Sequence, residues 1–395
     1  MVQIVKPRIR GIIATNSHPT GCEKNVQNHI DSIKAHVTPK PTNLNVLVVG
    51  ASMGYGLASR TALAWLYGGN TIGVFFDREP SGTRTATAGY YNTVAFHQQA
   101  QQDGLFAASI NIDAFSDEAK RQVIDIAKDR GKFDMVVYSI AAPKRIHPRT
   151  GVEHNSVIKP IGQPYSGVTI DLNRDTLTEV TIEPATETEI NDTIAVMGGE
   201  DLELWVDALL AEDLLAQEST VVSYSYIGSE LTWPIYRSGT IGQAKDDLEA
   251  RINRLDGRLV DKLGGHAYLS INKAIISQAS MAIPALPLYM SILNDIMDTR
   301  GINEEPIAQM VRLFTEHLGP GQTPTLDSER RIRLDDRELR PDVTAEVMAR
   351  WEKIHADNFR ELSDYDGLKR SFHNLFGFEV EGVDYDEAVE TELNW

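Results

Sequence analysis

The stretch NVLVVGASMGYG, residues 45–56, decides the fold class of this chain. It opens with an apolar run of strand length, which is typical of a strand buried on both faces. Gly50, Gly54 and Gly56 follow in the spacing G-x3-G-x-G, and an apolar helical pattern then continues to Tyr67. Glycine permits the tight turn that joins such a strand to such a helix. The stretch therefore predicts a buried parallel strand that turns sharply into a helix.

The same alternation of strand and helix continues toward the C-terminus. Further strands are predicted at 71–77, 106–113, 133–140, 219–228 and 265–272. Helices are predicted near 92–102, from a cap at Ser116 to Asp129, at 241–263, and in a helical pattern from Ile283 to Leu318. Strands alternating with helices indicate a parallel sheet that is covered on both faces. The predicted fold class is α/β, a Rossmann-type doubly wound parallel sheet with an inserted segment and extra terminal elements.

The organisation of the chain departs from this alternation in two places. Residues 145–216 are predicted to form an insertion near the substrate site, with a hairpin around 167–183 and a helix near 200–216. Residues 378–395 form an acidic C-terminal tail, which we expect to be a solvated hairpin followed by a short helix. Because no low-complexity linker divides the chain, we expect one large domain, 1–395.

Composition limits the classes of partner. The net charge of −18 argues against nucleic acid. The start of the chain lacks a signal-peptide pattern, and the most apolar run, 281–293, is too short to cross a bilayer. A single cysteine, Cys22, fits a reducing compartment and excludes a disulfide framework. One histidine and one cysteine in HPTGC (18–22) do not make a zinc site, so no metal is expected. We therefore expect a soluble cytoplasmic protein with no membrane partner.

The glycine turn is a candidate dinucleotide site. Its exposed amides and the positive end of the helix dipole would face a pyrophosphate, and Ser52 can add a hydroxyl donor. Asp77 ends the second strand, where an acid accepts hydrogen bonds from the adenosine ribose and repels a 2′-phosphate. This pattern favours NAD over NADP, although the neighbouring Arg78 weakens the preference.

Two further strand ends are candidates for cofactor contacts. Ligands of such sheets lie at the carboxyl ends of the strands. Asp113 and Ala114 end the third strand and would meet the adenine, while Ile140 and Ala141 end the fourth and would line the ribose. Ordinary packing at a strand end is an equally good interpretation of all four residues.

Tyr236 and Lys245 form a candidate catalytic pair. Nine residues along one helix would put their side chains on opposite faces. However, Thr240 and Gln243 match a capping box, which predicts that the helix starts at Ile241 and leaves Tyr236 in the preceding loop. Both side chains could then reach a nicotinamide ribose. Tyr226, at the end of the preceding strand, could supply a second donor or close the pocket.

The chemistry of hydride addition to an activated double bond suits this pair. The addition creates an oxyanion, to which a phenol can donate a hydrogen bond or a proton. The ordinary phenol pKa of about 10 is too high for free proton exchange at neutral pH. A nearby lysine cation lowers that pKa and can also hold the ribose hydroxyls.

These residues resemble a known family. The glycine turn is similar to that of the short-chain dehydrogenase/reductase superfamily, whose usual pair is Y-x3-K, and type I enoyl-ACP reductases use Y-x6-K. The spacing Y-x8-K with Tyr226 ten residues upstream resembles the NADH-dependent trans-2-enoyl-CoA reductases, also called type V enoyl-ACP reductases. The likeness extends in order over KPRIRG (6–11), HPTGCEKNV (18–26), GASMGYGLASR (50–60), GVFFD (73–77), YSIAAP (138–143) and INKAIISQASMAIP (271–284), and so covers essentially the whole chain.

The resemblance implies a reaction and a set of residues. NADH would reduce a trans-2-enoyl thioester of coenzyme A or acyl carrier protein, as in fatty acid synthesis or fermentation. Tyr236 would donate the proton, Tyr226 would contact the substrate and help to hold the enolate, and Lys245 would contact the cofactor. The implied cofactor contacts are Gly50, Ala51, Ser52, Met53, Gly54, Tyr55, Phe76, Asp77, Asp113, Ala114, Ile140, Ala141, Lys245, Ile275, Ile276 and Ser277. Asp77 stands where the family leads us to expect glutamate, and Ser277 where threonine is usual. The likeness favours a monomer, and the carrier and the acyl chain length stay open.

Two other stretches allow more than one interpretation. KRIHPR (144–149) would either meet the phosphates of a carrier or form a solvated loop. MAIPALPLYMSIL (281–293) would either wall an acyl pocket or belong to the core. Two alternative functions also stay open: a carbonyl reductase on the same fold, and a regulator that binds NADH without turnover. The Y-x8-K spacing and Tyr226 argue against the first, and the second leaves the tyrosine–lysine pair without a purpose.

Overall fold

The structure, a computed structural model, describes residues 1–395 and is built around one seven-stranded sheet. The order is β14-β13-β12-β7-β4-β5-β6, and every pairing is parallel. The strands are β4 (Asn45–Val49), β5 (Asn70–Phe75), β6 (Ala107–Asn111), β7 (Phe133–Tyr138), β12 (Leu215–Ser225), β13 (His266–Ile271) and β14 (Arg331–Arg333). Chain order reverses direction between β4 and β7, which is where such sheets bind ligands. The predicted doubly wound α/β sheet is confirmed.

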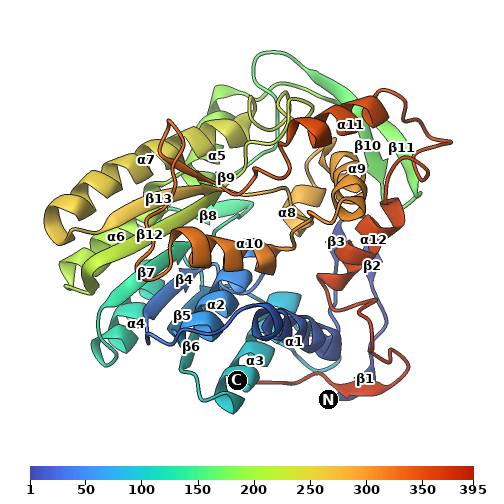
Figure 1. Ribbon diagram of the computed structural model, residues 1–395. Helices are drawn as coiled ribbons and strands as arrows, with labels where there is room; N and C mark the ends of the chain where they lie inside the picture. Colours follow the sequence, from blue (N-terminus) through green and yellow to red (C-terminus); the bar gives the residue numbers. More distant parts are fainter.

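Helices cover both faces of this sheet (Figure 1). Side chains alternate along each strand, so that Val46 and Val48 enter one core, whereas Leu47 and Val49 enter the other. The first core is closed by α1 (Pro19–His36), α2 (Gly54–Tyr67), α3 (Ala88–Gln102), α10 (Pro306–Arg312) and the π-helical turn η1 (Leu313–His317). The second is closed by α4 (Asp117–Lys128), α6 (Glu200–Ala211) and α7 (Thr240–Leu263).

Some helix boundaries follow local sequence signals, and one predicted signal fails. Gly68 ends α2 with φ 63°, and the Ser116 side chain accepts a hydrogen bond from the amide of Ala119 at the start of α4. The predicted capping box at Thr240 is wrong, because α7 begins at Thr240 itself and no side chain caps it. The Thr240 hydroxyl instead donates a hydrogen bond to the carbonyl of Val157, which belongs to the inserted segment.

A third core lies beyond the carboxyl ends of the strands, at the right of Figure 1. Its elements are β10 (Tyr165–Asp171), β11 (Thr176–Ile182), α8 (Gln278–Met281), α9 (Leu286–Thr299), α11 (Pro341–Trp351) and α12 (Tyr365–Asn374). The antiparallel pairing of β10 with β11 confirms the predicted hairpin. Leu286–Leu293 of α9 are buried in this core, so this half of the stretch 281–293 is core. The predicted helical pattern to Leu318 is interrupted after α9, where Gly301 adopts φ 64°.

The remaining elements join the insertion and the two ends of the chain. The insertion also holds β8 (Lys144–Ile146), β9 (Glu153–Asn155) and α5 (Glu187–Met197), and β2 (Ile9–Arg10) pairs with β3 (Ile13–Ala14) near the start. The predicted tail of a hairpin plus a helix is wrong: β15 (Ala388–Glu390) pairs antiparallel with β1 (Val2–Ile4). This pairing brings the termini together (Figure 1), and the Trp395 ring stacks on His97.

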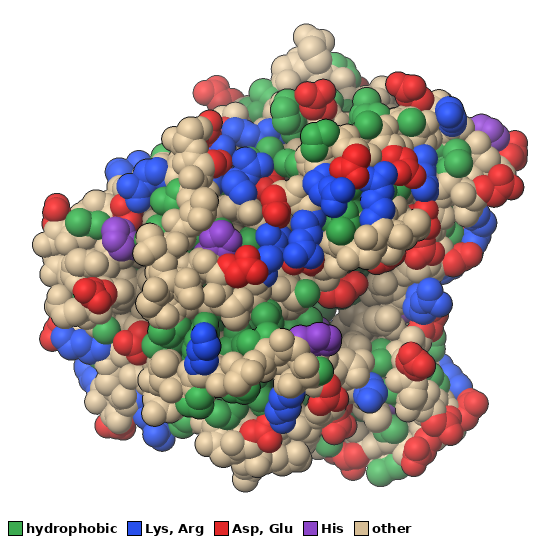
Figure 2. Space-filling model, viewed as in Figure 1, with side chains coloured by type: hydrophobic (Ala, Val, Ile, Leu, Met, Phe, Trp, Pro, Cys, Tyr) green, Lys and Arg blue, Asp and Glu red, His purple; other side chains and the backbone are tan.

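Acidic and basic side chains are interspersed over the face of the molecule that Figure 2 shows. The arginines of the segment 330–340 all have acidic partners: Asp256, Glu249, Asp335, Glu304 and Asp342. This segment therefore does not form a free basic surface. None of the helices combines the length and the apolar character that crossing a bilayer requires.

Candidate active site

The turn after β4 can be made only by glycine at its key positions. The amides of Gly50 and Ala51 donate to the carbonyl of Val74, at 2.8 and 3.0 Å. Gly50 adopts φ +90°, and a Cβ there would lie 2.2 Å from the carbonyl oxygen of Ser139. A Cβ on Gly56 would lie 1.8 Å from the carbonyl oxygen of Gly50. The glycines therefore allow α2 to start directly against the ends of β4 and β7.

This turn leaves a cradle for a phosphate. The cap residue Met53 offers no side-chain hydrogen bond to α2, so the first amides of the helix, from Gly54 to Gly56, lack partners within it. Gly54 adopts φ +52°, and the nearest heavy atom to its Cβ position is Ile275 Cδ1, at 3.9 Å. Free amides at the positive end of a helix dipole bind anions, and a bare backbone admits a diphosphate closely. The residues present therefore fit the pyrophosphate of a dinucleotide.

Asp77 is held rigidly beside this cradle. Its Oδ1 accepts a hydrogen bond of 2.6 Å from the Thr87 hydroxyl, and Asn111 bonds both its backbone N–H and its carbonyl at 2.9 Å. A Cβ on Gly89 would lie 2.2 Å from Asp77 Oδ2 and 2.6 Å from Ser52 Oγ, so these two side chains share one small space. Burial raises the pKa of Asp77, while hydrogen bonds from Thr87 and Ser52 oppose the shift.

The residues on either side of Asp77 point elsewhere. The Arg78 guanidinium donates through Nη2 to the carbonyls of Thr15 and Thr85, both at 3.2 Å, and so is held by backbone oxygens. The ring of Phe76 is 76% exposed. An exposed aromatic ring beside the phosphate cradle offers a stacking surface for a planar base.

The other sequence-predicted cofactor residues fall into two groups. Ile140 Cδ1 lies 3.3 Å from the Cβ position of Gly50, and Ile275 Cδ1 lies 3.9 Å from that of Gly54, so both side chains border the glycine turn. Asp113 instead accepts a hydrogen bond from the Phe115 amide within its own turn, and the Ala114 carbonyl is taken by Trp205. Ala141 is exposed, Ile276 is half-buried, and Ser277 caps α8. The Tyr55 hydroxyl donates to the carbonyl of Lys273 at 2.8 Å, which ties the start of α2 to the end of β13.

Tyr226 and Tyr236 lie in ring contact. Tyr226 follows the last residue of β12, and Tyr236 lies in the turns before α7, with ring centroids 5.2 Å apart in a T-shaped arrangement. The amides of Gly239 and Gly242 both donate to the carbonyl of Tyr236 at 3.1 Å, which fixes this loop. Tyr236 is buried, its hydroxyl has no hydrogen-bond partner in the protein, and burial raises its pKa. Its proton is therefore available to a ligand.

Lys245 reaches the same strand end from α7. Its ammonium Nζ donates to the carbonyl of Tyr224, two residues before Tyr226, at 3.1 Å. Burial lowers the pKa of Lys245 to about 8. The pair predicted from the sequence thus converges on the carboxyl end of β12 from a loop and from a helix.

Several residues of the site carry no sequence signal that singles them out. Thr87 and Asn111 hold Asp77, yet neither belongs to a recognisable motif. Glu338 accepts a hydrogen bond from the Tyr226 hydroxyl at 3.0 Å, although it lies in the charged run RLDDRELR (333–340), which is typical of a solvated surface. Only contacts with residues distant in the sequence, made after folding, distinguish it.

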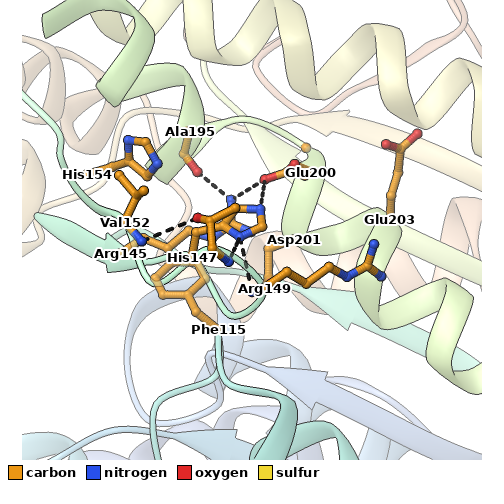
Figure 3. A network of polar contacts seen from close by, with 12 residues as sticks. Phe115, Arg145, His147, Arg149, Val152, His154, Ala195, Glu200, Asp201 and Glu203 are labelled. Carbon is orange, nitrogen blue, oxygen red and sulfur yellow. Dashed lines mark hydrogen bonds and ion pairs between the residues drawn. The ribbon is translucent and has the colours of Figure 1, made fainter. Parts of the chain in front are cut away.

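The basic stretch 144–149 lies in an ion-paired network (Figure 3). Arg145 is 1% exposed and donates through Nη1 to the Ala195 carbonyl and to Glu200, at 2.6 and 2.7 Å. His147 Nε2 lies 3.4 Å from the same Glu200 carboxylate, and Lys144 pairs with Glu153. The solvated-loop interpretation is therefore wrong for Arg145, which ties β8 to α5 and α6.

Comparisons with known proteins agree over the whole chain. The family model described as the trans-2-enoyl-CoA reductase catalytic region matches residues 84–318, the NAD(P)H binding domain of trans-2-enoyl-CoA reductase matches 4–82, and the enoyl reductase FAD binding domain matches 326–389. The enoyl-[acyl-carrier-protein] reductase [NADH] of Opitutus terrae is 49% identical over 99% of both chains. The trans-2-enoyl-CoA reductase [NADH] of Ruminiclostridium cellulolyticum is 50% identical over 99% of this chain and 98% of the other.

Solved structures give the same answer. The trans-2-enoyl-CoA reductase of Clostridium acetobutulicum in complex with NADH superposes with a TM-score of 0.95 at 42% identity, covering 98% of each chain. The Treponema denticola trans-2-enoyl-CoA reductase in complex with NAD superposes with a TM-score of 0.93 at 43% identity, covering 99% of this chain and 98% of the other.

The residues of the segment 326–389 do not fit a flavin dinucleotide. Its two helices, α11 and α12, carry acids at their starts, where a pyrophosphate would bind. Asp342 stands in the first turn of α11, and the Asp364 side chain already caps α12 by accepting from the Gly367 amide. The segment contributes instead a buried acid, Glu338, to the tyrosine pair.

Proposed function

Because the chain belongs to the trans-2-enoyl-CoA reductase family, we propose that it reduces the C2–C3 double bond of trans-2-enoyl thioesters with NADH. The observation that carries this proposal is the convergence of Tyr226, Tyr236 and Lys245 at the end of β12, in the sheet that bears the phosphate cradle. A bound NADH supplies a hydride to the β-carbon of the thioester. The side chains of this protein would bind and orient the thioester, stabilise the developing charge and supply the proton.

Tyr236 is the proposed proton donor. When the β-carbon gains the hydride, negative charge develops on the thioester oxygen, and the free Tyr236 hydroxyl donates a hydrogen bond to it. The O–H bond of Tyr236 then breaks as a C–H bond forms at the α-carbon, and the phenolate regains its proton from water. Lys245 holds the cofactor ribose and favours the transient phenolate through its charge. Tyr226, in ring contact with Tyr236, is proposed to contact the substrate.

The cofactor contacts are proposed for the residues that border the cradle. Gly50, Ala51, Ser52, Met53, Gly54 and Tyr55 would hold the pyrophosphate, Asp77 and Phe76 the adenosine, Ile140 and Ala141 the ribose, and Ile275, Ile276 and Ser277 the nicotinamide. Asp113 and Ala114 would meet the adenine through the turn that follows β6. The proximity of Ile140 and Ile275 to the glycine turn supports the ribose and nicotinamide assignments most directly.

The insertion 145–216 is proposed to cover the substrate. Val157 and Lys159 of the insertion bond Thr240 at the start of α7, so the inserted segment is tied next to Tyr236. A cavity of about 380 Å³ lies between Pro160–Ser166 of the insertion and Pro234 and Ser238 of the tyrosine loop. An opening between these two segments would admit an acyl chain on a carrier arm.

The biological setting is part of the proposal. Reduction of enoyl thioesters completes a round of fatty acid synthesis, and we propose that role, in the cytoplasm and as a monomer. Coenzyme A and acyl carrier protein both stay open as carriers, because relatives of similar identity bear each name.

The decisive experiment follows NADH oxidation by absorbance with a short trans-2-enoyl-CoA, beside a 3-oxoacyl-CoA of the same length. We expect turnover of the enoyl substrate and none of the ketone. Turnover of the ketone alone would identify a carbonyl reductase. A protein that binds NADH but turns over none of the three substrates (the enoyl-CoA, the 3-oxoacyl-CoA and an enoyl-acyl carrier protein) would be identified as a regulator.

Asp77 should set the preference for NADH over NADPH. The substitution Asp77→Asn keeps the size of the side chain and an oxygen that accepts from the Thr87 hydroxyl, but it removes the negative charge. Because the charge no longer repels a 2′-phosphate, we expect the ratio of kcat/KM for NADPH to that for NADH to rise about tenfold. Steady-state kinetics with both cofactors measures this ratio. An unchanged ratio would show that Asp77 does not face the 2′ position.

Lys245 should make cofactor binding depend on pH. Its pKa is lowered to about 8, so the ammonium is present at pH 7 and is lost as the pH rises through 8. A charge-assisted hydrogen bond is worth about 1.5–3 kcal/mol, so the Kd for NADH should rise about tenfold or more between pH 7 and pH 9.5. Fluorescence titration of NADH measures this change. Lys245→Met should bind weakly at both pH values, and an equal pH dependence in the two proteins would contradict the assignment.

A further inference from the structure

Glu338 is a fully buried acid in contact with Tyr226, one member of the tyrosine pair. It lies between β14 and α11, far from the glycine turn in sequence. Its Oε1 accepts hydrogen bonds from the hydroxyls of Tyr226 and Tyr289, at 3.0 and 2.8 Å. Its Oε2 accepts from the amide of Ala274 at 2.8 Å. A buried acid is costly to keep, so its partners indicate what it does.

These partners are those of an ionised carboxylate. All three are donors, and two hydroxyls share one oxygen, which a carboxylate oxygen with its free lone pairs can accommodate. Burial raises the pKa of Glu338 above its ordinary value, and the Ala274 amide, the charge of Lys273 and the two hydroxyls offset only part of that rise. Lys273 is itself buried, with its ammonium bound to the Ala274 carbonyl and to Asn294, both at 3.0 Å. The buried negative charge therefore has a buried positive one nearby.

A phenol has one proton to donate, and the hydroxyl of Tyr226 donates it in the hydrogen bond to Glu338. Tyr226 then faces the rest of the site with its ring and with oxygen lone pairs, which accept hydrogen bonds but do not donate them. Tyr236 differs, because its hydroxyl has no partner in the protein. Two tyrosines in ring contact thus have opposite hydrogen-bonding roles, and Glu338 sets the difference.

We infer that Glu338 is a positioning residue of the active site, which keeps Tyr226 from donating so that Tyr236 alone supplies a proton to the thioester. This inference rests on the proposed function. It changes the role that the family resemblance implies for Tyr226, from a second donor to the enolate to an oriented wall of the pocket. It also gives the segment 326–389 a task in the reductase site that requires no flavin.

Glu338→Gln tests the inference because it reverses the polarity of this contact. The Ala274 amide still needs an acceptor, so the new amide oxygen takes the place of Oε2. The amide nitrogen then faces the two hydroxyls and donates to them, which frees the proton of Tyr226 for the site. Tyr236→Phe removes the normal donor. We therefore expect Tyr236→Phe/Glu338→Gln to turn over at least about tenfold faster than Tyr236→Phe alone.

The controls separate this effect from a loss of packing. Adding Tyr226→Phe must abolish the recovery, since it removes the freed proton. Tyr236→Phe/Tyr289→Phe must show no recovery, because Tyr289 shares the same carboxylate oxygen but its loss leaves Tyr226 bound to Glu338. Thermal unfolding and NADH titration report whether each variant is folded. Should the Glu338→Gln variant fail to fold, Glu338→Met also removes the acceptor and must give the same recovery.

The outcomes distinguish failure of the proposed function from failure of the role of Glu338. No turnover of enoyl thioesters by the wild type would refute the proposed function. Wild-type turnover that is lost in Tyr236→Phe, and not regained in either Glu338 double variant with NADH bound, would overturn the role of Glu338 alone. Recovery that survives Tyr226→Phe would also overturn it, because the proton would then come from another group.

Discussion

Tyr236→Phe should lose enoyl reductase activity almost completely while it keeps its affinity for NADH. The substitution removes one hydroxyl that has no hydrogen-bond partner in the folded protein, so it leaves no unsatisfied group and disturbs no packing. A positioned proton donor contributes about 10²–10⁴-fold to a rate, so kcat should fall by about that factor. The KM for the enoyl substrate should change much less, because the hydrogen bond strengthens as charge develops on the oxygen. Absorbance assays and NADH titration measure the two effects separately.

A matched control is available on the neighbouring strand. Tyr268 of β13 is as buried as Tyr236, but its ring stacks on His266. Tyr268→Phe should leave kcat unchanged, which shows that loss of a phenol oxygen from this sheet is harmless by itself. If Tyr236→Phe kept more than about a tenth of the wild-type kcat, the general-acid role would have to pass to Tyr226 or to water.

The fold was predictable because its signals are local. The strand β4 is predicted from a continuous apolar run, and α2 from a pattern that ends at Gly68. The predictions of local structure failed where residues bond to partners that are distant in the sequence. The Thr240 hydroxyl bonds the Val157 carbonyl across the insertion and does not cap its own helix. The tail pairs with residues at the opposite end of the chain, and no local pattern predicts that pairing.

The arrangement of the candidate site was predictable to a similar extent. Glycines in a strand-to-helix turn, and an acid after the next strand, are specified by geometry that any such sheet shares. Tyr236 and Lys245 stood out because a break in the helix was needed between them. Glu338 did not stand out, because a glutamate among arginines is typical of a surface segment. Its contact with Tyr226 forms only in the folded protein. The solvated-loop interpretation of Arg145 failed for the same reason. Its burial against Glu200 depends on α6, and the two residues are 55 positions apart in the sequence.

Gly56→Ala should abolish NADH binding and destabilise the protein. The added Cβ would lie 1.8 Å from the carbonyl oxygen of Gly50 and 3.4 Å from the Ser139 side chain. That carbonyl cannot retreat easily, because the Gly50 amide is bonded to Val74 in the central sheet. The start of α2 must move away from β4, which should cost about 1–3 kcal/mol of folding free energy or more. The same movement opens the phosphate cradle, so the Kd for NADH should rise by about 10² or more.

Gly257→Ala is the matched control, because it makes the same chemical change where nothing opposes it. Gly257 lies on the exposed side of α7, and no heavy atom stands within 4 Å of its Cβ position. Alanine favours a helix interior over glycine by about 0.8–1.0 kcal/mol, so this variant should be more stable than the wild type and should bind NADH equally well. Chemical denaturation and NADH titration of both variants would measure the contrast. Equal NADH affinity in Gly56→Ala and Gly257→Ala would mean that α2 does not need its close approach to β4 to hold the cofactor.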